Sequence, residues 1–316
     1  MIWTAYCALK RRPPSEILIL TPQNPLLSIH PFTTLSCFGQ QCPLFEAQEL
    51  SHRRWIASSS AERTPAFSPD GRQIAVQSER SGWSEIWIHD RDGSHPRQLT
   101  GLKALVAGFP HWSPDGKKIA FHSRWPTEAA IYVVDVAGGR PKRLTTGPVS
   151  EEITPDWSHD GKWIYFSSRK SGVYQVWKIP SQGVDATQMT QNGGEVISES
   201  ADGKYVYYAR AGGDDSIWRM PVSGGEEQQL LSDVAGHGSA YAPAKSGIYF
   251  ISAATESTKQ QLAFYSFLNG KLKILANVSR PLDLGFAVSP DEHLLLYTQV
   301  DQFGSDLMLV ENFRTE

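Results

Sequence analysis

A short turn sequence recurs along the chain at nearly constant spacing. Phe-Ser-Pro-Asp-Gly, Trp-Ser-Pro-Asp-Gly and Trp-Ser-His-Asp-Gly are the first three copies, and their aspartates lie 45 residues apart. Later copies are more divergent, and one carries alanine in place of the aspartate. The residues at this position are Asp70, Asp115, Asp160, Asp202, Ala244 and Asp291. Six copies with a mean period of about 44 residues indicate a repeat architecture.

Each copy has the same internal order of predicted strands and turns. A strand with alternating apolar residues follows the Asp-Gly turn, as in residues 73–77, and alternation is the period of a β-strand. A third strand carries an aromatic residue 16 or 17 positions after the aspartate; these residues are Trp87, Tyr132, Trp177 and Trp218. A short fourth strand ends the copy, as in residues 97–100. Four strands in each of six copies predict an all-β protein, a six-bladed β-propeller with four-stranded blades.

The two ends of the repeat region complement one another. The last copy ends with a predicted third strand at 306–312, and the chain stops at residue 316. Residues 52–56, His-Arg-Arg-Trp-Ile, match the fourth strand of the first copy at 96–100, with Trp55 in the place of Leu99. The pattern therefore predicts that an N-terminal strand closes the last blade, which removes an exposed sheet edge.

The domain boundary is expected at the start of this strand. Residues 51–316 would form the propeller. Residues 1–50 contain six prolines and no sustained period, which favours an irregular or disordered N-terminal segment. The alternative is a small accessory element that docks on the ring.

Composition excludes several classes of function. The net charge is −3, and no clustered basic segment suggests a nucleic-acid surface. No apolar stretch reaches the ~18 residues of a membrane span. The apolar residues of the N-terminus precede Lys10, which is the reverse of the order in a secretory signal. The sequence therefore does not identify the cellular compartment, and the cytoplasm is the default expectation. The three cysteines all lie in the first 50 residues, so the repeats cannot depend on disulfides.

The repeats resemble those of the TolB-type, WD-like propeller family. The motif Ser-Pro-Asp-Gly-Lys-Lys-Ile-Ala-Phe at 113–121 and the strand Ile-Trp-Ile-His-Asp at 86–90 carry the resemblance, which extends over residues 52–316. The resemblance implies a bacterial, monomeric propeller that binds a protein or peptide. Propellers of this family occur as free-standing proteins, in TolB, and C-terminal to a winged-helix domain in bacterial regulators. By analogy with TolB, the resemblance is also compatible with a periplasmic location. Similar propellers accompany peptidase domains.

The repeated residues are predicted to be structural. Pro-Asp-Gly is turn chemistry, because the aspartate bonds nearby backbone N–H groups and glycine takes positive φ. The repeated aromatics are expected to pack one blade on the next. Cys37 and Cys42 with His30 and His52 fit no standard zinc spacing. No Gly-x-Ser-x-Gly elbow occurs, so no catalytic residue, metal or cofactor is predicted.

Binding is predicted at the mouth of the central channel. The strand that leads into each Ser-Pro-Asp-Gly turn should be the innermost, so the loops that precede it should ring the channel. The candidate contacts in these segments are Phe109, His111, Glu152, Asp156, Glu195, His237, Tyr241 and Arg280. The predicted function is a non-catalytic binding or scaffold propeller for a protein or peptide, including the sensor part of a regulator. The alternative is an enzyme or enzyme accessory, either the propeller half of a peptidase system or a glycosidase-like ring.

Overall fold

The structure is a computed structural model. It describes residues 16–20, 53–57, 60–124, 128–146, 151–210, 215–236, 238–254, 259–278, 280–301 and 304–311. These residues form strands, turns and bends. Within these ranges no helix could cross a membrane.

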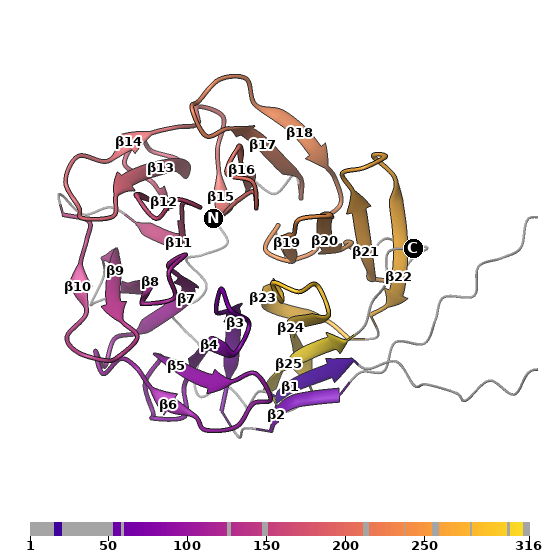
Figure 1. Cartoon of the computed structure of the whole chain (residues 1–316), viewed down its shortest axis with the longest axis horizontal. Helices are drawn as coiled ribbons and strands as arrows, with labels where there is room; N and C mark the ends of the chain where they lie inside the picture. The colour runs from indigo at the N-terminus through magenta and orange to yellow at the C-terminus, as the bar shows by residue number, and fades with distance from the viewer. Residues whose placement is uncertain are drawn as a thin grey trace, which may run out of the picture.

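Five four-stranded antiparallel sheets follow one another along the chain and around a ring (Figure 1). The first two contain β3 (Glu62–Phe67), β4 (Gln73–Ser78), β5 (Glu85–Asp90) and β6 (Arg97–Gln98), then β7 (Val106–Trp112), β8 (Lys118–Arg124), β9 (Ala129–Asp135) and β10 (Lys142–Arg143). The third contains β11 (Glu152–Trp157), β12 (Trp163–Ser168), β13 (Gln175–Pro180) and β14 (Thr187–Gln188). The fourth and fifth contain β15 (Glu195–Glu199), β16 (Tyr205–Ala209), β17 (Ile217–Pro221) and β18 (Gln228–Leu231), then β19 (Tyr241–Pro243), β20 (Gly247–Ile251), β21 (Gln261–Ser266) and β22 (Leu272–Asn277).

The sheet that closes the ring joins the two ends of the chain. It contains β23 (Leu282–Val288), β24 (Leu294–Asp301), β25 (Gly304–Glu311), β2 (Arg53–Ala57) and β1 (Glu16–Leu20). β2 pairs antiparallel with β25, with Arg54 opposite Met308. Figure 1 shows the indigo and purple first strands beside the yellow last strand. The N-terminal strand therefore completes this sheet as the sequence indicates.

This closing sheet also departs from the prediction of six equal four-stranded blades. That prediction is confirmed for five sheets. In the closing sheet β1 pairs with β2 and makes a fifth strand. Residues 16–20 thus differ from the irregular segment expected over 1–50, because β2 offers them a free edge to pair with. The other residues of 1–50 lie outside the described residues.

The repeated aspartates are turn residues, as predicted. In the first copy the Ser68 hydroxyl donates to Asp70 Oδ1 at 2.6 Å, and the same oxygen accepts the Arg72 N–H at 3.1 Å. The same pair of hydrogen bonds recurs at Asp115, Asp160, Asp202 and Asp291. In the first copy these bonds hold the pKa of the Asp70 carboxyl below its ordinary value.

The repeated aromatics pack each blade on the preceding one, again as predicted. Trp87 packs with Leu294 and Leu296 of the closing sheet. Trp177 lies against Ile131 and Val133 of the second blade. The third strands therefore join blades around the ring, and the buried core is a series of layers between neighbouring sheets.

Candidate functional site

The innermost strands share an unusual backbone conformation at one repeated position. Six residues before the turn aspartate, or before Ala244, the backbone has positive φ in every copy; the residues are Thr64, Phe109, Thr154, Val196, Gly238 and Gly285. Strand register shifts at this point in five of the six inner strands, as between Gly108 and His111. Four of these residues are not glycine, and the left-handed conformation costs such residues about 1–2 kcal/mol each. Backbone strain of this kind is found most often at binding sites.

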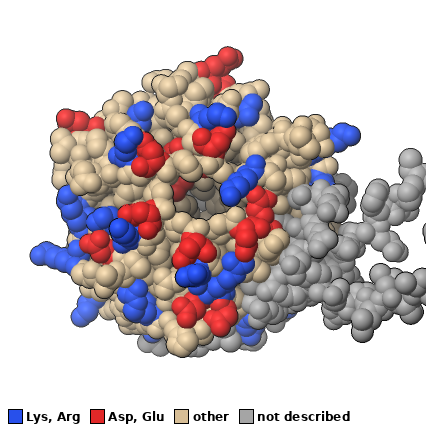
Figure 2. Space-filling model, viewed as in Figure 1, with Lys and Arg blue, Asp and Glu red and all other residues tan. Residues whose placement is uncertain are grey.

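A cavity of about 260 Å³ lies at the centre of the ring, and strands β3, β7, β11, β15, β19 and β23 all contribute to its wall. The wall runs from bulge residues such as Thr64 and Gly285 to the turn prolines Pro69 and Pro290. Most of the lining residues are of apolar type, such as Phe67, Phe286 and Val288, but polar and apolar atoms contribute about equally to the surface of the cavity. Figure 2 shows the hollow at the centre of the face, with acidic and basic side chains intermixed around it. The cavity therefore follows the halves of the inner strands nearest the Ser-Pro-Asp-Gly turns.

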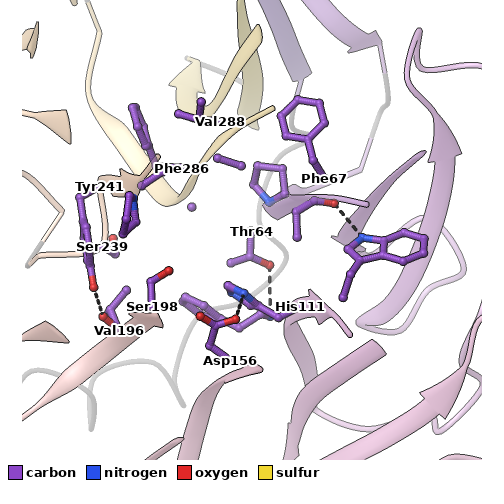
Figure 3. A pocket seen from close by; sticks show the side chains of 18 of the residues that line it. Thr64, Phe67, His111, Asp156, Val196, Ser198, Ser239, Tyr241, Phe286 and Val288 are labelled. Carbon is purple, nitrogen blue, oxygen red and sulfur yellow. Dashed lines mark hydrogen bonds and ion pairs between the residues drawn. The ribbon is translucent and has the colours of Figure 1, made fainter. Parts of the chain in front are cut away.

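One ion pair faces this cavity. His111 Nδ1 lies 3.0 Å from Asp156 Oδ1, and the two residues come from neighbouring inner strands (Figure 3). Asp156 also accepts the backbone N–H groups of Trp157 at 2.8 Å and Glu199 at 3.1 Å. Three donors thus fix the carboxylate, and the carboxylate fixes the imidazole. Among the residues that line the cavity, His111 and Asp156 are the only ones of the types His, Asp, Glu, Lys and Arg.

Two other predicted contacts, Phe109 and Tyr241, line the cavity but are held by neighbours. The Phe109 ring packs on His122 with centroids 5.6 Å apart. The Tyr241 hydroxyl donates to the Val196 carbonyl at 2.6 Å (Figure 3), and burial raises the pKa of Tyr241 well above its ordinary value. These aromatics shape the wall, while His111 and Asp156 supply its charge.

Glu152 lies apart from the predicted contacts that line the cavity. It is buried, does not line the cavity, and forms a 3.2 Å ion pair with Lys170. Glu62 occupies the equivalent position in the first blade and pairs with Arg80 at 2.6 Å. Because the side chains of successive strand residues point to opposite faces, a residue in a segment that leads into an inner strand can point between blades rather than into the channel.

The remaining predicted contacts do not meet at the cavity. Glu195 is half-buried, and burial raises the pKa of its carboxyl. Arg280 is exposed, and neither residue lines the cavity. His237 lies outside the described residues. Glu195 is the first residue of β15, and Arg280 precedes β23, which begins at Leu282.

Several residues of the wall were not predicted from the sequence, namely Thr64, Val196, Ser198, Gly285 and Phe286. A signal for the bulge was present, because three of the six bulge residues precede proline, as in Thr64-Pro65, Phe109-Pro110 and Thr154-Pro155. Proline restricts the residue before it and interrupts strand pairing. The described side chains contain no group of three His, Cys, Asp or Glu that could hold a metal ion. Cys37, Cys42, His30 and His52 lie outside the described residues.

We expect two buried histidines, His122 and His89, to make the protein sensitive to mild acid. Burial lowers the pKa of His122, beneath Phe109, to about 3, and that of His89 to about 4. The unfolded chain, with a histidine pKa of ~6.5, binds these protons more readily, so stability is lost as pH falls below 6.5. Each histidine should cost about 2 kcal/mol at pH 5. Urea unfolding at pH 7.5 and 5.0 measures this loss.

His122→Gln should reduce this pH dependence by about half. Glutamine suits the site, since Gln77 holds the equivalent position in the first blade, seven residues after the turn aspartate. The control is His95→Gln, because the His95 side chain is 83% exposed. An unchanged loss of stability in His122→Gln would show that other groups cause the acid sensitivity.

The fold and the cavity define an all-β propeller with a central cavity walled by its inner strands. The chain belongs to the TolB beta propeller domain family, whose sequence profile matches residues 58–279. This match covers most of the described ring.

Solved structures share this fold at low sequence identity. A protein assigned as TolB from Agrobacterium tumefaciens is 20% identical with a TM-score of 0.61, over 82% of this chain and 93% of that one. An oligogalacturonate lyase in complex with manganese is 14% identical with a TM-score of 0.54, over 79% and 90%. A puromycin hydrolase is 13% identical with a TM-score of 0.53, over 79% of this chain but 44% of that one. No curated protein sequence matches the chain.

Proposed function

We propose that this chain is a non-catalytic binding protein that takes an extended peptide segment, free or part of a partner protein, into the central cavity. The observation that carries the proposal is the cavity itself, a hollow lined mainly by residues of apolar type, with one oriented histidine–aspartate pair. Mostly apolar concave sites with a few placed polar groups are typical of ligand binding. The volume of about 260 Å³ is below the roughly 300–1,000 Å³ of drug-sized sites. It therefore suits one or two side chains of a peptide.

The ion pair gives the cavity a specific polar contact. When Nδ1 of a neutral His111 donates to Asp156, Nε2 of the same ring can accept a hydrogen bond from a ligand. A peptide N–H group is a suitable donor. Phe286 and Val288 from the closing sheet supply apolar contacts on another part of the wall. A peptide would thus be held by one hydrogen bond and by burial of an apolar side chain.

A peptide selection tests this function. The full chain would be immobilised, and binders would be selected from a display library of random 12-residue peptides. Affinities of the selected peptides would be measured by fluorescence anisotropy. We expect His111→Ala to raise Kd by roughly tenfold, the worth of one hydrogen bond with a favourable geometry.

His95→Ala is the matched control. His95 also lies beside an aspartate, with Nδ1 2.8 Å from Asp90 Oδ2, but on the surface of the first blade. Its replacement should leave Kd unchanged. Selected peptides that bind wild type, His111→Ala and Phe286→Ser equally would exclude the cavity as the binding site.

The second candidate is catalysis, and the same pair favours it. A carboxylate that fixes one nitrogen of an imidazole is the arrangement that orients a general base. In that case His111 would accept a proton from a small substrate in the cavity. Turnover of oligogalacturonate or of aminoacyl substrates, lost in both His111→Ala and Asp156→Asn, would favour this alternative over binding.

A further inference from the structure

The residue before the turn serine has the same backbone orientation in five of the six inner strands; these residues are Phe67, Trp112, Trp157, Glu199 and Val288. In each case the N–H of the serine donates to the second strand of the blade, as from Ser68 to the Gln73 carbonyl at 2.8 Å. Because neighbouring residues of an antiparallel strand direct their N–H groups to opposite sides, the N–H group before each serine points away from its sheet. These five N–H groups therefore face the channel.

Two of these N–H groups are already bound to one carboxylate. Asp156 accepts the N–H of Trp157 at 2.8 Å with Oδ1, and the N–H of Glu199, from the next blade, at 3.1 Å with Oδ2. Equivalent N–H groups of adjacent inner strands thus lie at a separation that suits the two oxygens of one carboxylate. Asp156 is a carboxylate that the chain itself supplies, and it shows what this level of the channel can hold.

The equivalent place in the closing sheet has no such side chain. Ala287 of β23 lies four residues before its turn aspartate, as Asp156 does. The two N–H groups beside it belong to Val288 and, on the next inner strand around the ring, to Phe67. Ala287 and Phe67 pack in one cluster, and all three residues line the cavity. Within the described part of the chain, these two N–H groups have no acceptor.

We propose that the N–H groups of Val288 and Phe67 bind the free C-terminal carboxylate of the peptide in the cavity. This proposal rests on the proposed function and deepens it, because it assigns one end of the peptide to one place in the ring. Each N–H group would donate to one carboxylate oxygen, and hydrogen bonds to a charged acceptor are the stronger kind. The side chain of the last residue would then lie against Phe286, which also lines the cavity.

The position of this pair in the ring favours it over the neighbouring one. Phe67 and Trp112 form the next such pair, but Trp112 directly follows His111, whose imidazole contacts Asp156. Val288 and Asp156, in contrast, lie on opposite sides of the cavity (Figure 3). Repulsion between two carboxylates falls with distance, so a second carboxylate is tolerated best beside Val288. A chain end also suits a cavity of about 260 Å³, because only the last one or two residues need to enter.

The first test uses the wild-type full chain and two small probes. The chain would be labelled with isotope-enriched phenylalanine for NMR, and the Phe67 N–H signal would be identified by its absence in Phe67→Leu. N-acetyl-leucine ends in a carboxylate and should move this signal downfield, because the N–H gains a charged acceptor. N-acetyl-leucinamide, the same molecule with an amide in place of the carboxylate, should leave the signal where it is.

The second test fills the site from within the chain. Ala287→Asp places a carboxylate beside the same N–H groups and should weaken the binding of N-acetyl-leucine by roughly tenfold or more. Ser81→Asp adds the same charge on an exposed loop of the first blade and should bind as wild type. Circular dichroism melting checks that both variants fold, and the comparison of the two probes on wild type stands without them.

Several results would overturn the proposal. Equal shifts of the Phe67 signal with both probes, or no shift with either, would show that the site does not bind a carboxylate. An equal shift with N-acetyl-glutamate α-amide would show that it accepts an acidic side chain rather than a chain end. Selected peptides that bind equally well with an amidated C-terminus would refute the carboxylate site and leave the peptide-binding function intact. A Phe67 shift with N-acetyl-leucine in a protein that yields no peptide binders would support the site and refute that function.

Discussion

Trp55→Ala should lower the free energy of unfolding by about 3–5 kcal/mol, the usual cost of truncating a buried tryptophan. Trp55 lies in the closing strand β2 and is buried between the first blade and the closing sheet, in one cluster with Ile74 and Leu296. Its indole N–H donates to the Arg91 carbonyl at 2.8 Å. The side chain therefore joins the two ends of the ring, and its loss leaves both a cavity and an unpaired carbonyl.

Urea denaturation followed by circular dichroism measures this effect. Trp83→Ala is the matched control, since Trp83 lies in the same part of the chain and is 42% exposed. We expect it to cost about 0.5 kcal/mol, as for most surface substitutions. Similar losses in the two variants would mean that β2 contributes little to closure of the ring.

Gly285→Ala should destabilise the protein by about 2–5 kcal/mol. Gly285 is the bulge residue of β23 at the junction between the closing sheet and the first blade, with φ at +111°. A Cβ there would lie 2.5 Å from Thr64 Cα and 2.7 Å from Thr64 N. Because these are backbone atoms, the contact can be relieved only if β3 moves. We expect a cost of ~1–3 kcal/mol from overpacking, and a further ~1–2 kcal/mol because alanine is strained at positive φ.

Gly138→Ala separates the two causes. Gly138 has φ at +102°, yet a Cβ there would meet nothing within 4 Å. This variant should therefore lose only the ~1–2 kcal/mol of backbone strain. Thermal and urea unfolding of the two variants should differ by about 2 kcal/mol. Equal losses would show that the inner strands of the first and last sheets can move apart at little cost.

Local sequence signals predicted most of the fold. The Ser-x-Asp-Gly turn depends on hydrogen bonds between residues two to five positions apart, such as Ser68 with Asp70 and Gln73. The second strands were predicted from alternating apolar and polar residues, and the third strands from a repeated aromatic residue. Both signals likewise depend on whether a single side chain is buried. The fifth strand of the closing sheet was not predicted, because β1 lies far from β2 in the sequence and has no counterpart in the repeat.

The candidate site was predicted only in part. Phe109, His111, Asp156 and Tyr241 do line the cavity, since they belong to the strands that the repeat identifies as innermost. Glu152 and Glu195 do not line it, and the cavity lies toward the turn prolines instead of the loops that lead into the inner strands. The bulges in five of the six inner strands contribute to this difference, because a shift in register changes which side chains face the channel.

The sequence by itself determined the repeat, the turns, the order of strands in the five regular blades, and the N-terminal strand that closes the ring. The repeat, the turns and the order of strands follow from contacts within one repeat. The closing strand follows from the last repeat, which lacks a fourth strand of its own. Only the tertiary structure decided that His111 meets Asp156, that Glu152 is buried against Lys170, and where the cavity lies. Such contacts depend on the rotation between neighbouring blades and on the bulge geometry, which the pattern of a single repeat does not contain.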